Sequence, residues 1–232
     1  MIARNIAVIR EQMAQAAQKA GRAPSEIQLC AATKMNDAAA VREAIAAGVD
    51  CCGENRVQEL TQKLAQHAYD GAPVHFIGHL QTNKVRQVVG AVTLIQSVDR
   101  AELLTCIEKE AAKRNLVQRI LLEVNVAGEA SKSGFAPEAV ADIAAAMEQF
   151  PHTLLCGLMA IPPISEKNGS NCRYFEKIHR ISVDITAKKY HNSSMGILSM
   201  GMSDDYTDAI ACGSTMLRIG TAIFGARNYH NP

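Results

Sequence analysis

Residues 27–68 read IQLCAATKMNDAAAVREAIAAGVDCCGENRVQELTQKLAQHA. Within this segment, residues 27–33 form an apolar run of strand length, and Asp37 then caps an alanine-rich helix that ends at Gly48. Residues 49–52 form a second short apolar run, and the segment RVQELTQKLAQHA that follows it is again helical in pattern. A strand followed by a helix, twice in succession, predicts parallel strands joined by helical crossovers.

The same alternation continues along the rest of the chain. A helix over residues 2–20 precedes the first strand, because Ile2, Ile6, Ile9 and Met13 recur at helical spacing. Further strands are predicted at residues 74–77, 92–96, 118–124, 154–159, 197–200 and 216–219, and further helices at residues 81–89, 99–114, 136–149, 169–188 and 204–212.

Eight such repeats predict an α/β fold, a single (β/α)8 TIM barrel with an extra N-terminal helix. An open, doubly wound parallel sheet is the alternative. No linker rich in Pro, Ser or Gly divides the chain, so residues 1–232 are predicted to form one domain. The polar stretch at residues 165–171 is predicted to be a surface loop.

Composition excludes several classes of protein. Lys plus Arg number 24 against 23 Asp plus Glu, so a net charge of +1 offers no general attraction to nucleic acid or to an acidic membrane. No apolar stretch approaches the roughly 20 residues of a membrane span, and residues 1–22 lack the apolar core of a signal peptide. Seven cysteines without a CxxC pair predict neither a disulfide framework nor a zinc ribbon. We expect a reduced, cytoplasmic protein.

Polar residues that could take part in chemistry follow the predicted strands, and Lys34 is the strongest candidate among them. It follows the apolar run LCAAT, and a lysine held among apolar groups loses proton affinity and becomes an amine nucleophile. Schiff-base formation with an aldehyde is the natural chemistry. The structural alternative is a lysine that reaches water or pairs with Glu54.

The last two predicted strands are followed by segments that could hold an anion. Ser203 precedes Asp204 at an apparent helix start, and Gly220 and Thr221 follow the eighth strand. The alternative is two glycine turns with an Asp cap. Arg218 lies inside the final strand, where it would be either an ion-paired structural residue or a ligand contact.

A metal site is not predicted. His75 is expected to be a core histidine, and the sequence contains no HxH, HExxH or Cys/His cluster. The serines lack the GxSxG elbow of many hydrolases, which leaves hydrolase chemistry unsupported.

Seven stretches spread over nearly the whole chain match a known family: TK at 33–34, GENRVQE at 53–59, HFIGHLQTNK at 75–84, VNVAGEASKSGF at 124–135, GLMAIPP at 157–163, LSMGMSDD at 198–205 and GSTMLRIGTAIFGAR at 213–227. In these stretches the chain resembles the YggS/PROSC family of pyridoxal 5′-phosphate (PLP) homeostasis proteins. Departures are slight: Thr33 stands where a serine commonly precedes the lysine, and Met35 and Asn36 replace a frequent Thr-Lys.

The resemblance implies a barrel like the N-terminal domain of alanine racemase, with PLP as cofactor, bound to Lys34 as a Schiff base. It further implies that Arg218 faces the pyridine nitrogen and that Asn55 lies beside the ring or its 3′-oxygen. The phosphate would be held by Ser203, Gly220 and Thr221.

The resemblance favours a non-catalytic protein that controls intracellular PLP and helps to balance amino and keto acids. The main alternative is a PLP-dependent enzyme of the racemase or decarboxylase class, and a class I aldolase is a weaker one. PLP stabilises a carbanion best when its pyridine nitrogen is protonated. A guanidinium at Arg218 stays charged and cannot protonate this nitrogen, which weakens PLP as an electron sink. The chain ends at Pro232, about one barrel long, and Tyr206 and Tyr229 are the nearest candidates for a second acid or base. We expect a monomer with PLP as ligand and PLP-dependent apo-enzymes as candidate recipients.

Overall fold

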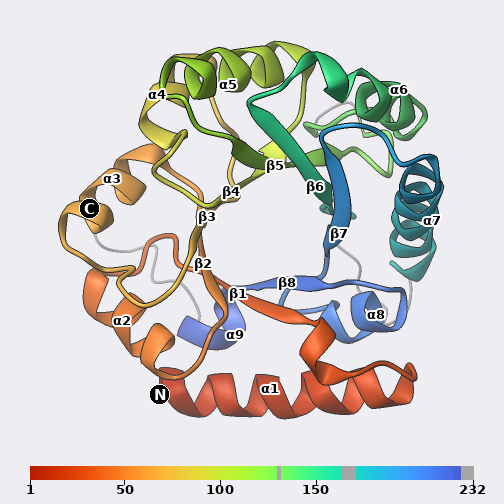
Figure 1. Ribbon diagram of the computed structural model, residues 1–232. Coiled ribbons are helices and arrows are strands. Elements are labelled where there is room, and N and C mark those ends of the chain that lie inside the picture. The colour runs from red at the N-terminus through yellow and green to blue at the C-terminus, as the bar shows by residue number, and fades with distance from the viewer. Residues whose placement is uncertain (130–131, 164–170, 226–232) are drawn as a thin grey trace.

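The computed structural model describes residues 1–129, 132–163 and 171–225. Eight parallel strands follow one another around a closed barrel, and the first pairs with the last (Figure 1). The predicted (β/α)8 barrel is therefore confirmed. The strands are β1 (Gln28–Ala32), β2 (Cys51–Glu54), β3 (Val74–Phe76), β4 (Leu94–Val98), β5 (Gln118–Val124), β6 (Thr153–Ala160), β7 (Ser193–Ser199) and β8 (Met216–Ile219).

Helices surround the barrel, and the predicted N-terminal helix lies outside it against α2 and α8 (Figure 1). This helix buries Ile6, Ile9, Met13 and Ala17 on one face, as the spacing predicts. The helices are α1 (Ile2–Lys19), α2 (Ala38–Ala46), α3 (Val57–Ala65), α4 (Val85–Val88), α5 (Ala101–Lys113), α6 (Val140–Ala145), α7 (Cys172–Lys188), α8 (Tyr206–Ala211) and α9 (Thr221–Phe224), with 3-10 turns η1 (Pro24–Glu26), η2 (Thr82–Lys84), η3 (Pro137–Ala139) and η4 (Ala146–Gln149).

Some boundaries differ from the sequence prediction. The helix expected at residues 81–89 is divided into η2 and α4, and the one expected at 136–149 is divided into η3, α6 and η4. Strand β7 begins at Ser193, four residues early, because its first half is polar and only partly buried and therefore lacks an apolar run. Most of the loop predicted at residues 165–171 lies outside the described residues.

The start of α8 is a further correction. The helix begins at Tyr206, and Asp204 does not cap it. The carboxylate of Asp205 instead accepts a hydrogen bond from the backbone N–H of Met202, at 2.8 Å. The segment before α8 is therefore a closed turn and does not extend the helix.

The barrel interior holds both apolar and polar side chains. One cluster of apolar and sulfur-containing side chains packs there, namely Cys30, Cys51, Leu94, Leu121, Cys156, Met159 and Met216. Glu123 of β5, Ser199 of β7 and Arg218 of β8 each lie within the last two residues of their strand. Because function in such barrels lies at the carboxyl ends of the strands, these polar groups mark the candidate site.

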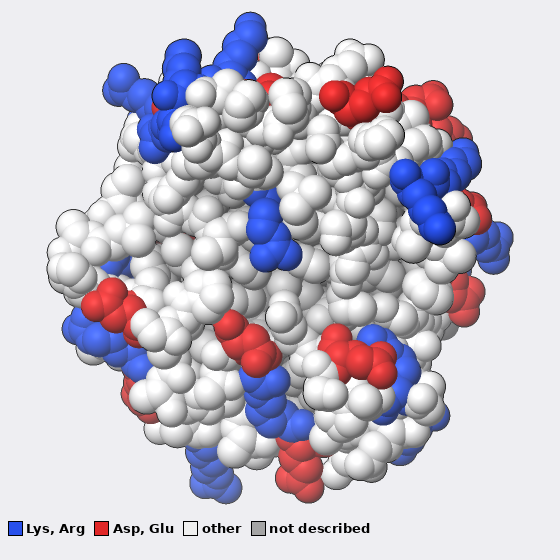
Figure 2. Space-filling model, in the orientation of Figure 1, with Lys and Arg blue, Asp and Glu red and all other residues white. Residues whose placement is uncertain are grey.

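On the face shown in Figure 2, basic and acidic side chains are interspersed around the rim, and a basic side chain lies near the centre among uncharged residues. Among the described residues, no helix has both the length and the apolar character that a membrane crossing requires.

Candidate functional site

The structure brings the predicted site residues to one end of the barrel. Lys34 follows β1 by two residues, Asn55 follows β2 directly, and Ser203 follows β7. Arg218 lies in β8, and Gly220 and Thr221 come immediately after that strand. Strands β7, β8, β1 and β2 are consecutive neighbours in the barrel, so these residues share one sector of its carboxyl end.

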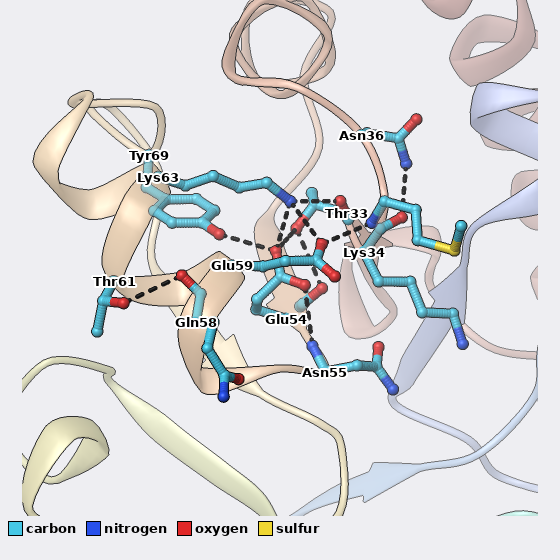
Figure 3. Close-up of polar contacts among 12 residues, drawn as sticks. Thr33, Lys34, Asn36, Glu54, Asn55, Gln58, Glu59, Thr61, Lys63 and Tyr69 are labelled. Atoms are coloured by element: carbon cyan, nitrogen blue, oxygen red, sulfur yellow. Dashed lines mark hydrogen bonds and ion pairs between the residues drawn. The ribbon is translucent and has the colours of Figure 1, made fainter. Parts of the chain in front are cut away.

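A buried charge cluster lies beside Lys34, and Glu54 is its centre (Figure 3). The carboxylate of Glu54 accepts hydrogen bonds from Lys63 Nζ at 2.7 Å, from the Tyr69 hydroxyl at 3.0 Å and from Thr33 Oγ1 at 3.1 Å. Burial and the carboxylate of Glu54 raise the pKa of Tyr69, which therefore stays a hydrogen-bond donor. Glu54 thus pairs with Lys63, and Figure 3 shows the side chain of Lys34 pointing away from this pair.

The cluster holds the backbone on both sides of Lys34. Lys63 Nζ donates a second hydrogen bond to the carbonyl oxygen of Thr33, at 2.8 Å. On the other side, the backbone N–H of Met35 donates to a carboxylate oxygen of Glu59, at 2.7 Å. One buried and one exposed polar contact therefore fix the direction in which the Lys34 side chain leaves the strand.

Asn55 contains a buried acceptor without a partner. Its backbone N–H donates to Glu54 at 3.0 Å, whereas its side-chain Oδ1 is buried and accepts no hydrogen bond from the described residues. Gly78 packs against its backbone so closely that a Cβ at residue 78 would lie 2.2 Å from the Asn55 carbonyl oxygen. A buried carbonyl oxygen is almost always hydrogen-bonded, so this atom points to a ligand that supplies a donor.

Ser203 contacts the start of α9. Ser203 Oγ accepts a hydrogen bond from the backbone N–H of Ala222, at 3.3 Å, which places the hydroxyl at the first turn of α9. A Cβ at Gly220 would lie 3.4 Å from both the Cβ and the carbonyl oxygen of Ala32, so the backbone passes close to β1 there. Hydroxyl and amide groups at a helix start are donors that suit a phosphate.

Arg218 is buried in the barrel, and neutral oxygens bind it. Its Nη1 donates to the carbonyl oxygen of Ser199 at 2.7 Å and to Ser199 Oγ at 2.6 Å, and its Nη2 donates to the carbonyl oxygen of Ala160 at 3.0 Å. Within the described residues no salt bridge to Arg218 is formed. Hydrogen bonds and not an ion pair thus hold Arg218 in the described part of the chain, and its role as a ligand contact stays a prediction.

Sequence reasoning missed Glu123 and the group around Glu54. Burial and the neighbouring carboxylate of Asp99 raise the pKa of Glu123 to about 7, and Arg218 acts in the opposite direction. Glu123 is the penultimate residue of β5, and a charged residue at that point of a buried strand is the signal that could have identified it. Lys63 lies nine residues after Glu54, and nothing in the sequence at that separation indicates that the two residues form a pair.

The fold brings cysteine and histidine together although the sequence contains no local Cys/His motif. Cys30, Cys51 and His75 place their ligand atoms within 4.8 Å of one another, all buried, among the residues that the structure describes. They come from three neighbouring strands at spacings of one β/α repeat, which no local motif reveals. His75 is a core histidine, as predicted. The absence of a metal stays a prediction.

Comparison with known proteins gives consistent matches. The family model "Alanine racemase, N-terminal domain" matches residues 3–228. A pyridoxal phosphate homeostasis protein of Pseudomonas aeruginosa is 42% identical over 100% of this chain and 98% of its own length. Among solved structures, an unknown protein from Bifidobacterium adolescentis has a TM-score of 0.89 at 36% identity, covering 96% of this chain and 94% of that chain. PipY of Synechococcus elongatus, solved with PLP bound, has a TM-score of 0.83 at 30% identity, covering 97% and 100%.

Proposed function

We propose, because this chain belongs to the pyridoxal phosphate homeostasis protein family, that it binds PLP at the carboxyl end of the barrel, with Lys34 as the residue that forms the Schiff base. The observation that carries the assignment is the geometry around Lys34. Its backbone is held from both sides, while the partnerless oxygen of Asn55 and the buried guanidinium of Arg218 belong to neighbouring strands.

Each polar group of PLP has a counterpart among these residues. The Lys34 amine would react with the aldehyde, and Asn55 Oδ1 would accept a hydrogen bond beside the ring or at its 3′-oxygen. Arg218 would face the pyridine nitrogen as a donor, because a guanidinium has no acceptor. Ser203, Gly220 and Thr221 would donate to the phosphate. When bound, PLP supplies an aldehyde that exchanges between amines.

The direct test is the visible absorbance of the purified protein loaded with PLP, measured before and after borohydride reduction. We expect an imine band that disappears on reduction, and a reduced adduct that peptide mass spectrometry places on Lys34. An adduct on another lysine would contradict the assignment of Lys34. Absence of any adduct would contradict covalent binding altogether.

The double substitution Ser203→Ala and Thr221→Val is expected to weaken PLP retention while the Schiff base still forms. Hydrogen bonds to charged groups contribute about 1.5–3 kcal/mol each, so affinity should fall about tenfold or more for each lost hydroxyl. Equilibrium dialysis measures this. Thr61→Val, on the exposed face of α3, is the matched control and should leave affinity unchanged. Unchanged affinity in the double variant would place the phosphate elsewhere.

The protein loaded with PLP is expected to show no appreciable turnover of free amino acids. A protonated guanidinium at Arg218 leaves the pyridine nitrogen unprotonated. A positioned acid or base typically contributes ~10²–10⁴-fold, and the phenols of Tyr69 and Tyr206 are engaged with Glu54 and Gln12. Tyr229 lies outside the described residues.

NMR of the α-proton of L- and D-amino acids in D₂O checks this expectation. We expect exchange no faster than with PLP and a simple amine. Fast, stereospecific exchange that disappears in Lys34→Ala would instead support a racemase or decarboxylase.

The proposal extends to the setting in which the protein acts. We infer a single-domain monomer in the cytoplasm that holds PLP and passes it to PLP-dependent apo-enzymes. The exchangeable Schiff base supports such a transfer, since a second amine can displace Lys34. Size-exclusion chromatography with light scattering tests the monomer, and activation of an apo-enzyme by the loaded protein in the presence of a free-PLP trap tests the transfer.

A further inference from the structure

A pair of thiols lies inside the barrel toward the amino ends of the strands. Cys30 and Cys51 are direct partners in the register of β1 and β2, so their side chains point to the same face of the sheet. Neighbouring strands are about 4.8 Å apart, which lies within the Cα separation that a disulfide spans. Their sulfur atoms and a ring nitrogen of His75 lie within 4.8 Å of one another.

A chain of hydrogen bonds connects this pair to Arg218. Arg218 donates to Ser199 Oγ at 2.6 Å, and the Ser199 hydroxyl donates to Gln96 Oε1, also at 2.6 Å. The Gln96 amide nitrogen then contacts His75 Nδ1 at 2.9 Å and Met216 Sδ at 3.1 Å. A guanidinium only donates, so Ser199 Oγ accepts from Arg218 and donates its own proton to Gln96 Oε1. The amide nitrogen of Gln96 then donates to His75, and His75 Nδ1 is the acceptor.

The direction of the hydrogen bonds from Arg218 to His75 affects the chemistry of Cys30 and Cys51. With Nδ1 accepting from Gln96, a ring proton is on Nε2, and His75 is a hydrogen-bond donor to Cys30. Hydrogen bonding from Cys51 and then from His75, against the effect of burial, lowers the pKa of Cys30 to about 6. The pKa of Cys51 is raised by the same hydrogen bond and by burial. Cys30 is therefore the thiol of the pair that loses its proton more readily.

A cavity of about 370 Å³ at the amino ends of the strands reaches Cys51, whereas Cys30 lies behind it and is fully buried. Cys51 and His75 line it, together with Thr93, Arg119 and Met216. A small, uncharged oxidant such as hydrogen peroxide fits a cavity of this size.

We propose that Cys30 and Cys51 are an oxidisable pair that forms an intramolecular disulfide when the protein meets a peroxide. The Cys30 thiolate attacks one peroxide oxygen, the O–O bond breaks, and the hydroxide released takes up a proton to become water. The Cys30 sulfenic acid is then attacked by Cys51, the S–O bond breaks, and hydroxide leaves with the Cys51 proton as a second water. The two cysteines lose two electrons and the peroxide gains them.

The experiment treats the full chain with a small excess of hydrogen peroxide, blocks remaining thiols with iodoacetamide, and maps peptides without reduction. We expect a linked pair of peptides containing Cys30 and Cys51, reversed by dithiothreitol. Cys51→Ser should stop at a sulfenic acid on Cys30 that dimedone traps, whereas Cys30→Ser should leave Cys51 alkylatable.

A second thiol pair requires a control. Cys172 and Cys212 are also hydrogen-bonded, and burial followed by this contact raises the pKa of Cys212 to about 12. The experiment is therefore repeated in a Cys172→Ser and Cys212→Ser background, where the Cys30 and Cys51 linkage should persist.

Two results would overturn the proposal. In the first, Cys30 and Cys51 stay fully alkylatable while other thiols are oxidised. In the second, the purified protein retains stoichiometric zinc that Cys30→Ser releases, which would make the cluster a metal site.

Discussion

Lys34→Ala is expected to abolish covalent retention of PLP while the barrel stays folded. Alanine has no amine, so no imine can form, and the half-buried Lys34 side chain is not part of the packed core. The borohydride adduct should fall from stoichiometric to background. Weak non-covalent binding should persist, since the proposed phosphate donors Ser203 and Thr221 are unchanged.

The measurement combines visible absorbance, adduct mass and circular dichroism. Lys109→Ala, an exposed lysine on the outer helix α5, is the control and should keep the full adduct. An imine band in Lys34→Ala protein of native circular dichroism would show that a different amine holds PLP.

Lys63→Met is expected to be the most destabilising single change near the site. Lys63 and Glu54 are both buried, and removing the cation leaves the Glu54 carboxylate uncompensated inside the protein. Breaking a buried pair in this way costs about 3–5 kcal/mol in the free energy of unfolding. Urea denaturation followed by circular dichroism measures the loss.

Two further variants test whether the loss of stability comes from the buried pair of Lys63 and Glu54 and not from the removal of a lysine as such. Lys113→Met removes a lysine whose side chain is 74% exposed and whose partner Glu110 is 3.9 Å away, so its effect should be at most about 1 kcal/mol. The double variant Glu54→Gln and Lys63→Met should recover part of the loss, since no unpaired charge is left. If Lys63→Met unfolds like Lys113→Met, the pair does not hold the loop around Lys34.

Periodicity along the chain was enough to predict the barrel and the sector that holds the candidate site. Apolar runs alternate with helical segments, and parallel strands all end at the same face, so Lys34, Asn55 and Thr221 had to converge once the strands were placed. This information is local, because each strand end is visible in the few residues around it.

The contacts between strands could not be predicted in this way. Ser199 and Gln96 are 103 residues apart, and Glu54 is held by Lys63 and Tyr69, which follow it in the chain and return to it from the outer layer. The pairing of Cys30 with Cys51 likewise depends on the register of β1 against β2, where a shift of one residue would turn one of the two sulfurs to the other face. Register and side-chain direction are set by packing across the whole barrel, and only the tertiary structure contains them.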